Sequence, residues 1–314
     1  MSFFSVVIPL YNKQAFVAQT LESVLTQTFQ DFEILVVDDC STDGGKDVVR
    51  QFTDTRIKLI SHETNKGLSA ARNTGIKSSQ ADYIAFIDAD DRWKPQFLQK
   101  IDEMTRLFPD AGIFATAYEE VHPGNISVAI HKNVDINNGE MAIINDFFLA
   151  ASKQPILWYG SAVVKKEVFG KVGDFDETIT WYEDVDFNIR ANLHYNLAYY
   201  NSSCALYTIA SQNQITRTNI DSRVVCNLSE YEKYTASRPS LKLFLDINRY
   251  ALAMEYKLAG NTSAFEEHSS AINPASLTKP QKILLGLAPG AARLIRNFKL
   301  FLLRHGIRLT TFSS

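Results

Sequence analysis

The first ninety residues alternate short apolar runs with amphipathic segments. The apolar runs predict strands at Phe4–Leu10, Phe32–Val37, Ile57–Ser61 and Tyr83–Ile87. The segments between them predict helices at Ala15–Gln27, Lys46–Phe52 and Leu68–Ile76. This alternation predicts an α/β fold with a Rossmann-like, mostly parallel sheet flanked by helices. Ligands of such sheets bind just beyond the carboxyl ends of the strands.

Acidic residues stand at two of these strand ends. Asp38 and Asp39 close the second predicted strand, and Asp88, Asp90 and Asp91 follow the fourth. Like charges in a partly desolvated cleft repel one another unless a cation joins them, and a hard divalent cation with oxygen ligands is the usual partner. Residues two apart in an extended chain point the same way, so Asp88 and Asp90 can reach one ion. In the alternative interpretation, Asp91 caps the following helix and the other two acids are solvated.

The remainder of the chain divides into two parts. A strand is predicted at Ile113–Glu120, a polar hairpin at 122–125, a helix at Met141–Ala151 and a strand at Ser161–Val164. From Asp221 to about Gly260 the pattern is helical, with a break at 237–240. We therefore predict an α/β domain over 1–218 and a C-terminal helical annex over 219–314.

Composition and short motifs exclude several classes of protein. A net charge of -3, with no GxxxxGK[ST] and no GxGxxG motif, argues against a nucleic-acid partner and against the common phosphate loops. Cys40, Cys204 and Cys226 are far apart and odd in number, which fits a reducing cytosol better than a disulfide framework. The chain shows no signal-peptide pattern after Met1 and no run of 18 apolar residues, so we expect a cytoplasmic protein without a membrane span.

The C-terminal part of the chain is basic and amphipathic. Between Lys279 and Arg308 there are seven cations and no acid, and Pro289 with Gly290 interrupts the run. After that break, Leu294, Ile295, Phe298, Phe301 and Leu302 are predicted to share one helical face. Two interpretations follow: residues Lys282–Arg308 make a peripheral contact with an anionic membrane, or the apolar face packs on the protein's own annex.

Five motifs in order resemble a known enzyme family. They are SVVIPLYNK, LVVDDCSTDGG, NKGLSAARNTGI, YIAFIDADD and WYEDVDFNIR, spread over roughly Ser5 to Thr216. The series is similar to that of inverting family-2 glycosyltransferases with the GT-A fold, of the bacterial surface-glycan type. The resemblance implies a nucleotide-sugar-binding half at 1–110 and an acceptor and catalytic half at 111–218. It also implies transfer of a sugar from a nucleotide diphosphate sugar, most simply a UDP-sugar, to a hydroxyl of a glycan or lipid-linked glycan.

The resemblance assigns donor-binding roles in the first half. Pro9, Tyr11 and Asn12 are expected on the loop after the first strand, lining the nucleoside pocket. Asp39 is expected to accept a hydrogen bond from the base, because a carboxylate is only an acceptor. Arg72 is expected to reach the base or the diphosphate; without the resemblance it would be interpreted as an exposed helix arginine paired with an acid.

The resemblance also implies a metal cofactor and a catalytic pair. Asp90 is expected to be the main protein ligand of Mn²⁺ or Mg²⁺, with Asp88 near the ribose and the metal. Asp184 matches the general base that takes a proton from the acceptor hydroxyl, and Glu183 would orient the acceptor or the base. On the acceptor side we expect Gly160, Ser161 and Trp181. From the residues alone, the acids at 183–186 would simply favour a helix start.

One departure from the family pattern and two alternative functions complete the prediction. Many relatives carry a histidine a few residues after a tyrosine that corresponds to Tyr207, where this chain has Ala210. A sugar-phosphate nucleotidyltransferase would share the fold, but it usually begins with a glycine-rich basic phosphate loop that IPLYNK lacks. A nucleotide-sugar-binding or scaffold protein without catalytic activity is the second alternative.

Overall fold

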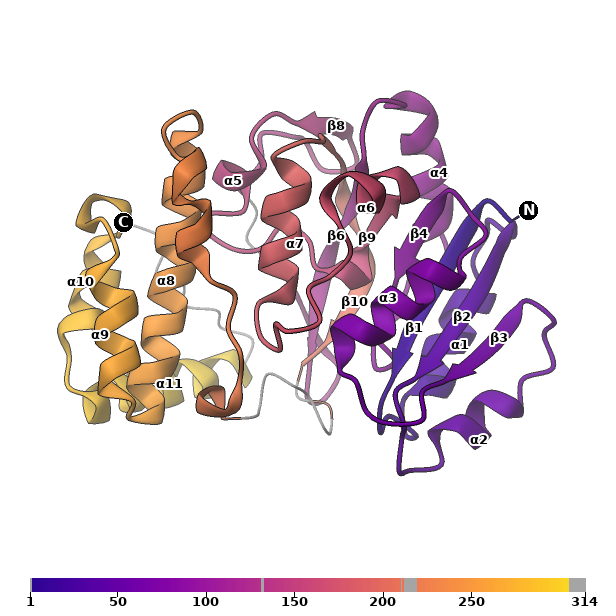
Figure 1. Cartoon of the computed structure of the whole chain (residues 1–314), viewed down its shortest axis with the longest axis horizontal. Coiled ribbons are helices and arrows are strands. Elements are labelled where there is room, and N and C mark those ends of the chain that lie inside the picture. Colours follow the sequence, from indigo (N-terminus) through magenta and orange to yellow (C-terminus); the bar gives the residue numbers. More distant parts are fainter. Residues whose placement is uncertain (1, 131–132, 210, 212–218, 305–314) are drawn as a thin grey trace.

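The computed structural model describes residues 2–130, 133–209, 211 and 219–304 (Figure 1). Within these residues, ten strands form one sheet in the order β3-β2-β1-β4-β9-β6-β10-β5, with β7 paired to β6 and β8 to β10. The strands are β1 Phe4–Leu10, β2 Phe32–Asp38, β3 Ile57–Ser61, β4 Tyr83–Phe86, β5 Arg92–Trp93, β6 Ile113–His122, β7 Ile126–Ala129, β8 Met141–Ile144, β9 Ala162–Lys165 and β10 Leu197–Thr208.

The first half of the sheet confirms the predicted topology. Strands β3, β2, β1 and β4 are all parallel, and Leu10 of β1 pairs in register with Asp38 of β2. The second half is mixed, because β9 runs antiparallel to both β4 and β6, while β6 and β10 are parallel. The sheet is therefore parallel in the first half, and mixed where the acceptor and catalytic half was predicted.

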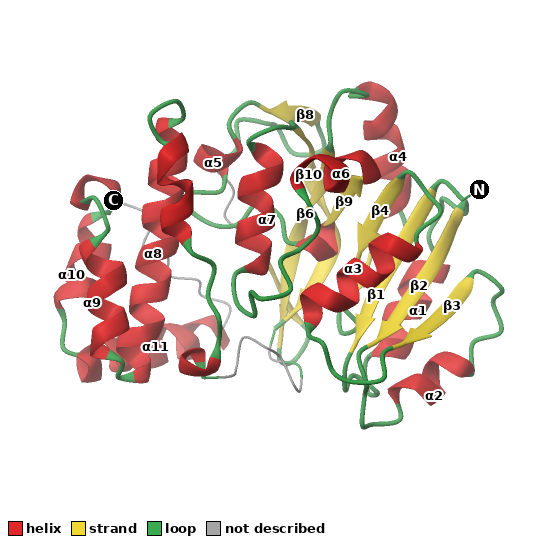
Figure 2. Ribbon diagram, viewed as in Figure 1, coloured by secondary structure: helices red, strands yellow, loops and turns green. Residues whose placement is uncertain are grey.

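Helices cover both faces of the sheet (Figure 2). They are α1 Val17–Leu25, α2 Gly45–Arg50, α3 Leu68–Ser78, α4 Phe97–Leu107, α5 Phe147–Ala150, α6 Lys166–Val172 and α7 Glu183–Asn192. Residues of α1, α2 and α4 pack in one core, and residues of α3, α6 and α7 pack in a second core on the opposite face. Helix α3 approaches β1 closely at Gly75, where an added Cβ would lie 2.3 Å from Val7 Cγ1.

The helix predicted at Met141–Ala151 is wrong. Residues Met141–Ile144 form β8, which pairs antiparallel with β10, and only the short helix α5 follows. Asp146 separates the two elements, because its side chain caps α5 by accepting the Leu149 N–H at 3.0 Å. Edge pairing with β10 thus overrides a pattern that reads as helical over so short a segment.

The C-terminal annex contains α8 Pro239–Ala259, α9 Thr262–Ser270, α10 Lys279–Gly286 and α11 Pro289–Arg304. It shares a core with the second half of the sheet, where Phe244 of α8 packs on Phe147 and Phe148. The predicted boundary at 218–219 falls beside residues outside the described part and stays a prediction. None of the described helices has the length and apolar character that crossing a membrane requires.

Candidate functional site

The loops after β1 and β2 are joined at the carboxyl edge of the sheet. Asn12 has a left-handed backbone with φ of 52°, and its side-chain oxygen accepts the Thr42 N–H at 2.8 Å. Tyr11 beside it is exposed. Pro9 was expected on this loop, but it lies inside β1, buried and opposite Val37. Of the three residues, only Tyr11 and Asn12 therefore lie on the loop after β1.

Asp39 organises the segment that leads into α3. Its buried carboxylate accepts the backbone N–H groups of Lys66 at 2.8 Å and Gly67 at 2.7 Å, and it lies 2.7 Å from Nδ1 of His62. Gly67 has a φ of 92°, which a residue with a side chain rarely adopts. The expected contact between Asp39 and a base stays a prediction, and the carboxylate already holds three protein donors.

The three acids after β4 are compensated by the protein in three different ways. Lys13 Nζ lies 2.7 Å from Asp90 Oδ2, and Arg72 Nη2 lies 3.3 Å from Asp88 Oδ1. Asp91 is fully buried, and burial together with the neighbouring charges of Asp90 and Asp88 raises its pKa well above the usual range. Charge repulsion at this strand end is thus relieved by one side-chain cation beside Asp90 and another beside Asp88, while burial disfavours the charged form of Asp91.

Asp91 has a structural role that neither interpretation of the sequence anticipated. Its carboxyl oxygens accept the Thr208 N–H at 2.7 Å and the Trp158 indole N–H at 3.2 Å. It therefore ties β4 to β10 instead of capping the next helix, which begins only at Phe97.

Arg72 is buried between carboxylates from both halves of the domain. Its guanidinium is 3.0 Å from Glu183 Oε1, besides its contact with Asp88, and it lies over the rings of Tyr159 and Phe175. The side chain is only 4% exposed, so the alternative of an exposed surface arginine is wrong. Two acidic partners and two aromatic faces fix this cation between the turn after β4 and the start of α7.

Glu183 and Asp184 open helix α7, as the sequence pattern predicts. Tyr182 precedes them in the left-handed region with φ of 69°, so the chain turns sharply into the helix. Burial raises the pKa of Asp184 to about 7, the charge of Glu183 adds to the shift, and Arg72 opposes it. Asp186, two residues on, is a structural acid that accepts from Arg190 Nε at 2.9 Å.

Gly160 and Ser161 are buried and pack against Trp158. The Gly160 carbonyl accepts the Trp93 indole N–H at 2.7 Å, and an added Cβ at Gly160 would lie 2.5 Å from the Trp158 ring. Ser161 Oγ lies 3.0 Å from the Trp158 carbonyl and is completely buried. Both residues position Trp158, and their expected contact with an acceptor stays a prediction. Ala210 lies outside the described residues.

Trp181 lies at the junction between the site and the annex. It borders a cavity of about 200 Å³ together with Glu255 and Leu258 of α8 and Arg296 of α11. Its indole nitrogen is buried and has no hydrogen-bond partner among the residues that the structure describes. The expected contact between this ring and an acceptor sugar stays a prediction.

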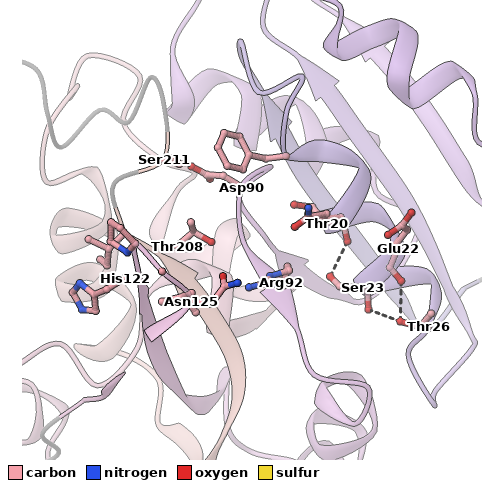
Figure 3. A pocket seen from close by; sticks show the side chains of 16 residues that line it. Thr20, Glu22, Ser23, Thr26, Asp90, Arg92, His122, Asn125, Thr208 and Ser211 are labelled. Atoms are coloured by element: carbon pink, nitrogen blue, oxygen red, sulfur yellow. Dashed lines mark hydrogen bonds between the residues drawn. The ribbon is translucent and has the colours of Figure 1, made fainter. Parts of the chain in front are cut away.

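A larger groove of about 820 Å³ opens beside Asp90 (Figure 3). Thr20, Glu22 and Ser23 of α1 line one side, and the turn after β6 lines the other. Asp90 and Ser211 lie between the two walls, with Ser211 hydrogen-bonded to both Asp90 and Lys13. A groove of this size is in the range of ligand-binding clefts.

The model of the family "Glycosyl transferase family 2" matches residues 5–173, more than half of the chain. The chain belongs to this family. Its fold is the GT-A fold of such enzymes: the S. aureus protein TarS, solved as residues 1–349 with UDP-GlcNAc, aligns with a TM-score of 0.62 over 92% of this chain and 88% of that one, at 18% identity.

Two curated relatives of this family-2 domain match over shorter segments. The putative teichuronic acid biosynthesis glycosyltransferase TuaG of Bacillus subtilis is 42% identical over 98 residues, which are 31% of this chain and 39% of TuaG. The UDP-Glc:alpha-D-GlcNAc-diphosphoundecaprenol beta-1,3-glucosyltransferase WfgD of Escherichia coli is 43% identical over 89 residues, which are 28% of this chain and 35% of WfgD. The aligned segments thus span well under half of these relatives.

Three residues that contact the predicted acids were not anticipated from the sequence. Lys13 and Ser211 both contact Asp90, and Trp158 contacts Asp91. A signal for Lys13 was present, because it directly follows the IPLYN segment and three neighbouring acids need cations. Ser211 and Trp158 carry no local pattern, since the folding of distant segments brings them to the site.

Proposed function

We propose that this protein is a metal-dependent, inverting glycosyltransferase that moves a sugar from a UDP-sugar to a hydroxyl of a glycan or lipid-linked glycan. The buried Arg72 bridge carries the proposal, because it places one fixed cation between the acids after β4 and the pair at the start of α7. A cation held there can attract a diphosphate while the half-buried Asp184 lies nearby. The names of TarS in complex with UDP-GlcNAc and of WfgD support the choice of a UDP-sugar donor.

The proposed reaction needs one proton acceptor opposite the leaving group. Asp184 takes the proton from the acceptor hydroxyl as that oxygen forms a bond to the anomeric carbon. The bond between the anomeric carbon and the diphosphate oxygen breaks in the same step, and UDP leaves with the electron pair. Attack from the face opposite the leaving group inverts the anomeric centre. Arg72 attracts the diphosphate, and Glu183 orients the hydroxyl or the base.

The carboxylate oxygens at the end of β4 are suitable ligands for a hard divalent cation such as Mn²⁺ or Mg²⁺. Asp88 and Asp90 offer carboxylate oxygens, and the described residues hold no group of three or more acidic, His or Cys side chains that would close a metal site. A metal bound largely by the phosphates of a nucleotide needs only one or two protein carboxylates. When bound, the ion would neutralise charge on the leaving diphosphate. Lys13 competes with it for Asp90.

A binding and turnover screen tests the proposed function. We expect UDP to raise the melting temperature of the protein in the presence of Mn²⁺. At a UDP concentration of a hundred times its Kd, the free energy of unfolding should increase by about 2.7 kcal/mol. ADP, CDP and GDP serve as matched ligands, and EDTA should remove the effect. Slow release of UDP from one UDP-sugar without an acceptor would separate an enzyme from a scaffold. If no nucleotide diphosphate stabilises the protein with either metal, the proposal is wrong.

The raised pKa of Asp184 predicts a specific pH dependence. Because a general base must be deprotonated, we expect kcat/KM to fall about tenfold per pH unit below pH 7 and to level off above it. The free energy of unfolding depends on pH in the opposite direction. A carboxyl group whose pKa rises from 3.8 to about 7 on folding favours the folded state at low pH, and this contribution is lost as pH rises through 7. A flat activity profile between pH 5 and 8, measured with UDP release, would contradict the assignment.

A further inference from the structure

Helix α11 is attached to the protein by its small and basic side chains. Ala292 is buried, Arg296 lies 3.4 Å from Glu255, and Arg293 Nη2 donates to the Leu258 carbonyl at 2.9 Å. These contacts anchor the helix on the C-terminal half of α8. The alternative in which the apolar face packs on the protein's own annex fails for Leu294 and Phe298, which are 72% and 58% exposed.

Three large apolar side chains of α11 are exposed and form a stripe along the helix. Leu294, Phe298 and Phe301 are 72%, 58% and 55% exposed, and their spacing of four and three residues places them one above the other. Single exposed apolar residues are common on soluble proteins, but adjacent large ones on one helix face mark a surface that binds something. We call these three residues the α11 stripe.

The charge around the α11 stripe selects its partner. The segment Lys279–Arg308 holds seven cations and no acid, whereas the chain as a whole carries -3. Lys279, Lys282 and Arg293 are exposed. A two-fold contact between copies would bring each basic segment against its equal, which like charges disfavour. A bilayer with anionic headgroups offers both an apolar layer and the opposite charge.

We propose that the α11 stripe inserts into the headgroup region of an anionic membrane and holds the protein at its surface. The cavity beside Trp181 and Arg296 brings the inner face of α11 next to the segment that precedes Glu183. Figure 1 shows α11 at the lower edge of the molecule, the edge toward which β1 runs from the N-terminus. Docking would thus turn the catalytic edge of the sheet toward the lipid. This orientation fits a lipid-linked acceptor, a point that rests on the proposed function.

Vesicle binding by the full chain tests the proposal. We expect co-sedimentation with vesicles of phosphatidylcholine containing about 30% phosphatidylglycerol, and little with phosphatidylcholine alone. Binding should weaken at high salt, since the Debye length falls from about 10 Å at 0.1 M to about 3 Å at 1 M. The triple variant Leu294→Ser, Phe298→Ser, Phe301→Ser should bind at least about tenfold more weakly. The double variant Leu107→Ser, Leu149→Ser removes exposed leucines elsewhere and should bind as the natural chain does.

Three outcomes would overturn the membrane proposal. One is equal sedimentation of the triple variant and the natural chain, and another is no binding to anionic vesicles at low salt. The third is a lipid-free dimer of the natural chain that the triple variant converts to a monomer, since a second copy would then cover the α11 stripe. The assay uses no nucleotide, metal or acceptor, so these outcomes leave the proposed sugar transfer to be judged separately. Matched thermal melts show whether the triple variant folds.

Discussion

Replacing Asp184 by Asn should lower kcat by about 10²–10⁴-fold with little change in the affinity for the UDP-sugar. The amide keeps the size of the side chain and cannot accept the proton, so only the step that needs a base is lost. The raised pKa of Asp184 also means that the Asn variant should not be destabilised near neutral pH, because it removes a carboxylate that burial disfavours. Single-turnover rates and donor Kd, measured side by side, separate the two effects.

Asp186 provides the matched control on the same helix. It is equally an aspartate near the start of α7, but its carboxylate holds Arg190 and the Tyr231 hydroxyl. Asp186→Asn should therefore lower the melting temperature while the folded fraction keeps most of its turnover. If Asp184→Asn instead loses donor binding and keeps its turnover, Asp184 belongs to the donor pocket and the assignment as base is wrong.

Replacing Asp90 by Asn should reduce sugar transfer by about 10³-fold or more and should remove the dependence of UDP binding on Mn²⁺. The amide oxygen is a weaker ligand than the carboxylate, and Asp90 is the residue expected to bind the metal most directly. The UDP affinity with and without Mn²⁺ and the amount of Mn²⁺ bound can both be measured by titration, so this test does not rely on turnover.

Two further variants show whether Asp90 acts through a metal or through Lys13. Asp47→Asn makes the same charge change on an exposed acid of α2 and should alter neither measurement. Lys13→Gln removes the ion pair but leaves the carboxylate, so Mn²⁺ binding in the presence of UDP should persist or strengthen. If Lys13→Gln loses Mn²⁺ binding as completely as Asp90→Asn, the ion pair and not metal ligation explains the effect.

The fold was predictable where the local hydrophobic pattern alone decides whether a segment forms a strand or a helix. Four runs in the first ninety residues predicted the parallel half of the sheet. Strands β1 and β2 are fully buried and are therefore recognisable by their nearly continuous apolar side chains, whereas β3 at the edge of the sheet is only partly buried. The same approach failed at Met141–Ile144, where pairing with β10 decides the structure. The resemblance to the family put Pro9 on the loop, although the predicted strand Phe4–Leu10 already contained it, and the structure agrees with the strand.

The acidic residues of the candidate site were predictable from the sequence, but most of the side chains that contact them were not. Repulsion among Asp88, Asp90 and Asp91 predicts neighbouring cations, and the structure places Lys13 and Arg72 beside two of these acids. No sequence pattern could tell that Asp91 is buried against Trp158, which lies 67 residues further along the chain. The roles assigned to Asp184 and Asp90 stay predictions that the variants above test, and the role assigned to Asp39 stays a prediction.

The buried Arg72 gives the two halves of the cleft a common counterion. Asp88 belongs to the donor half and Glu183 to the catalytic half, and both carboxylates draw on one guanidinium. A ligand anion that takes a share of this cation on one side weakens its attraction for the acid on the other side. Donor and acceptor affinities then carry a coupling free energy, and thermodynamic linkage requires each ligand to change the affinity of the other by the same factor.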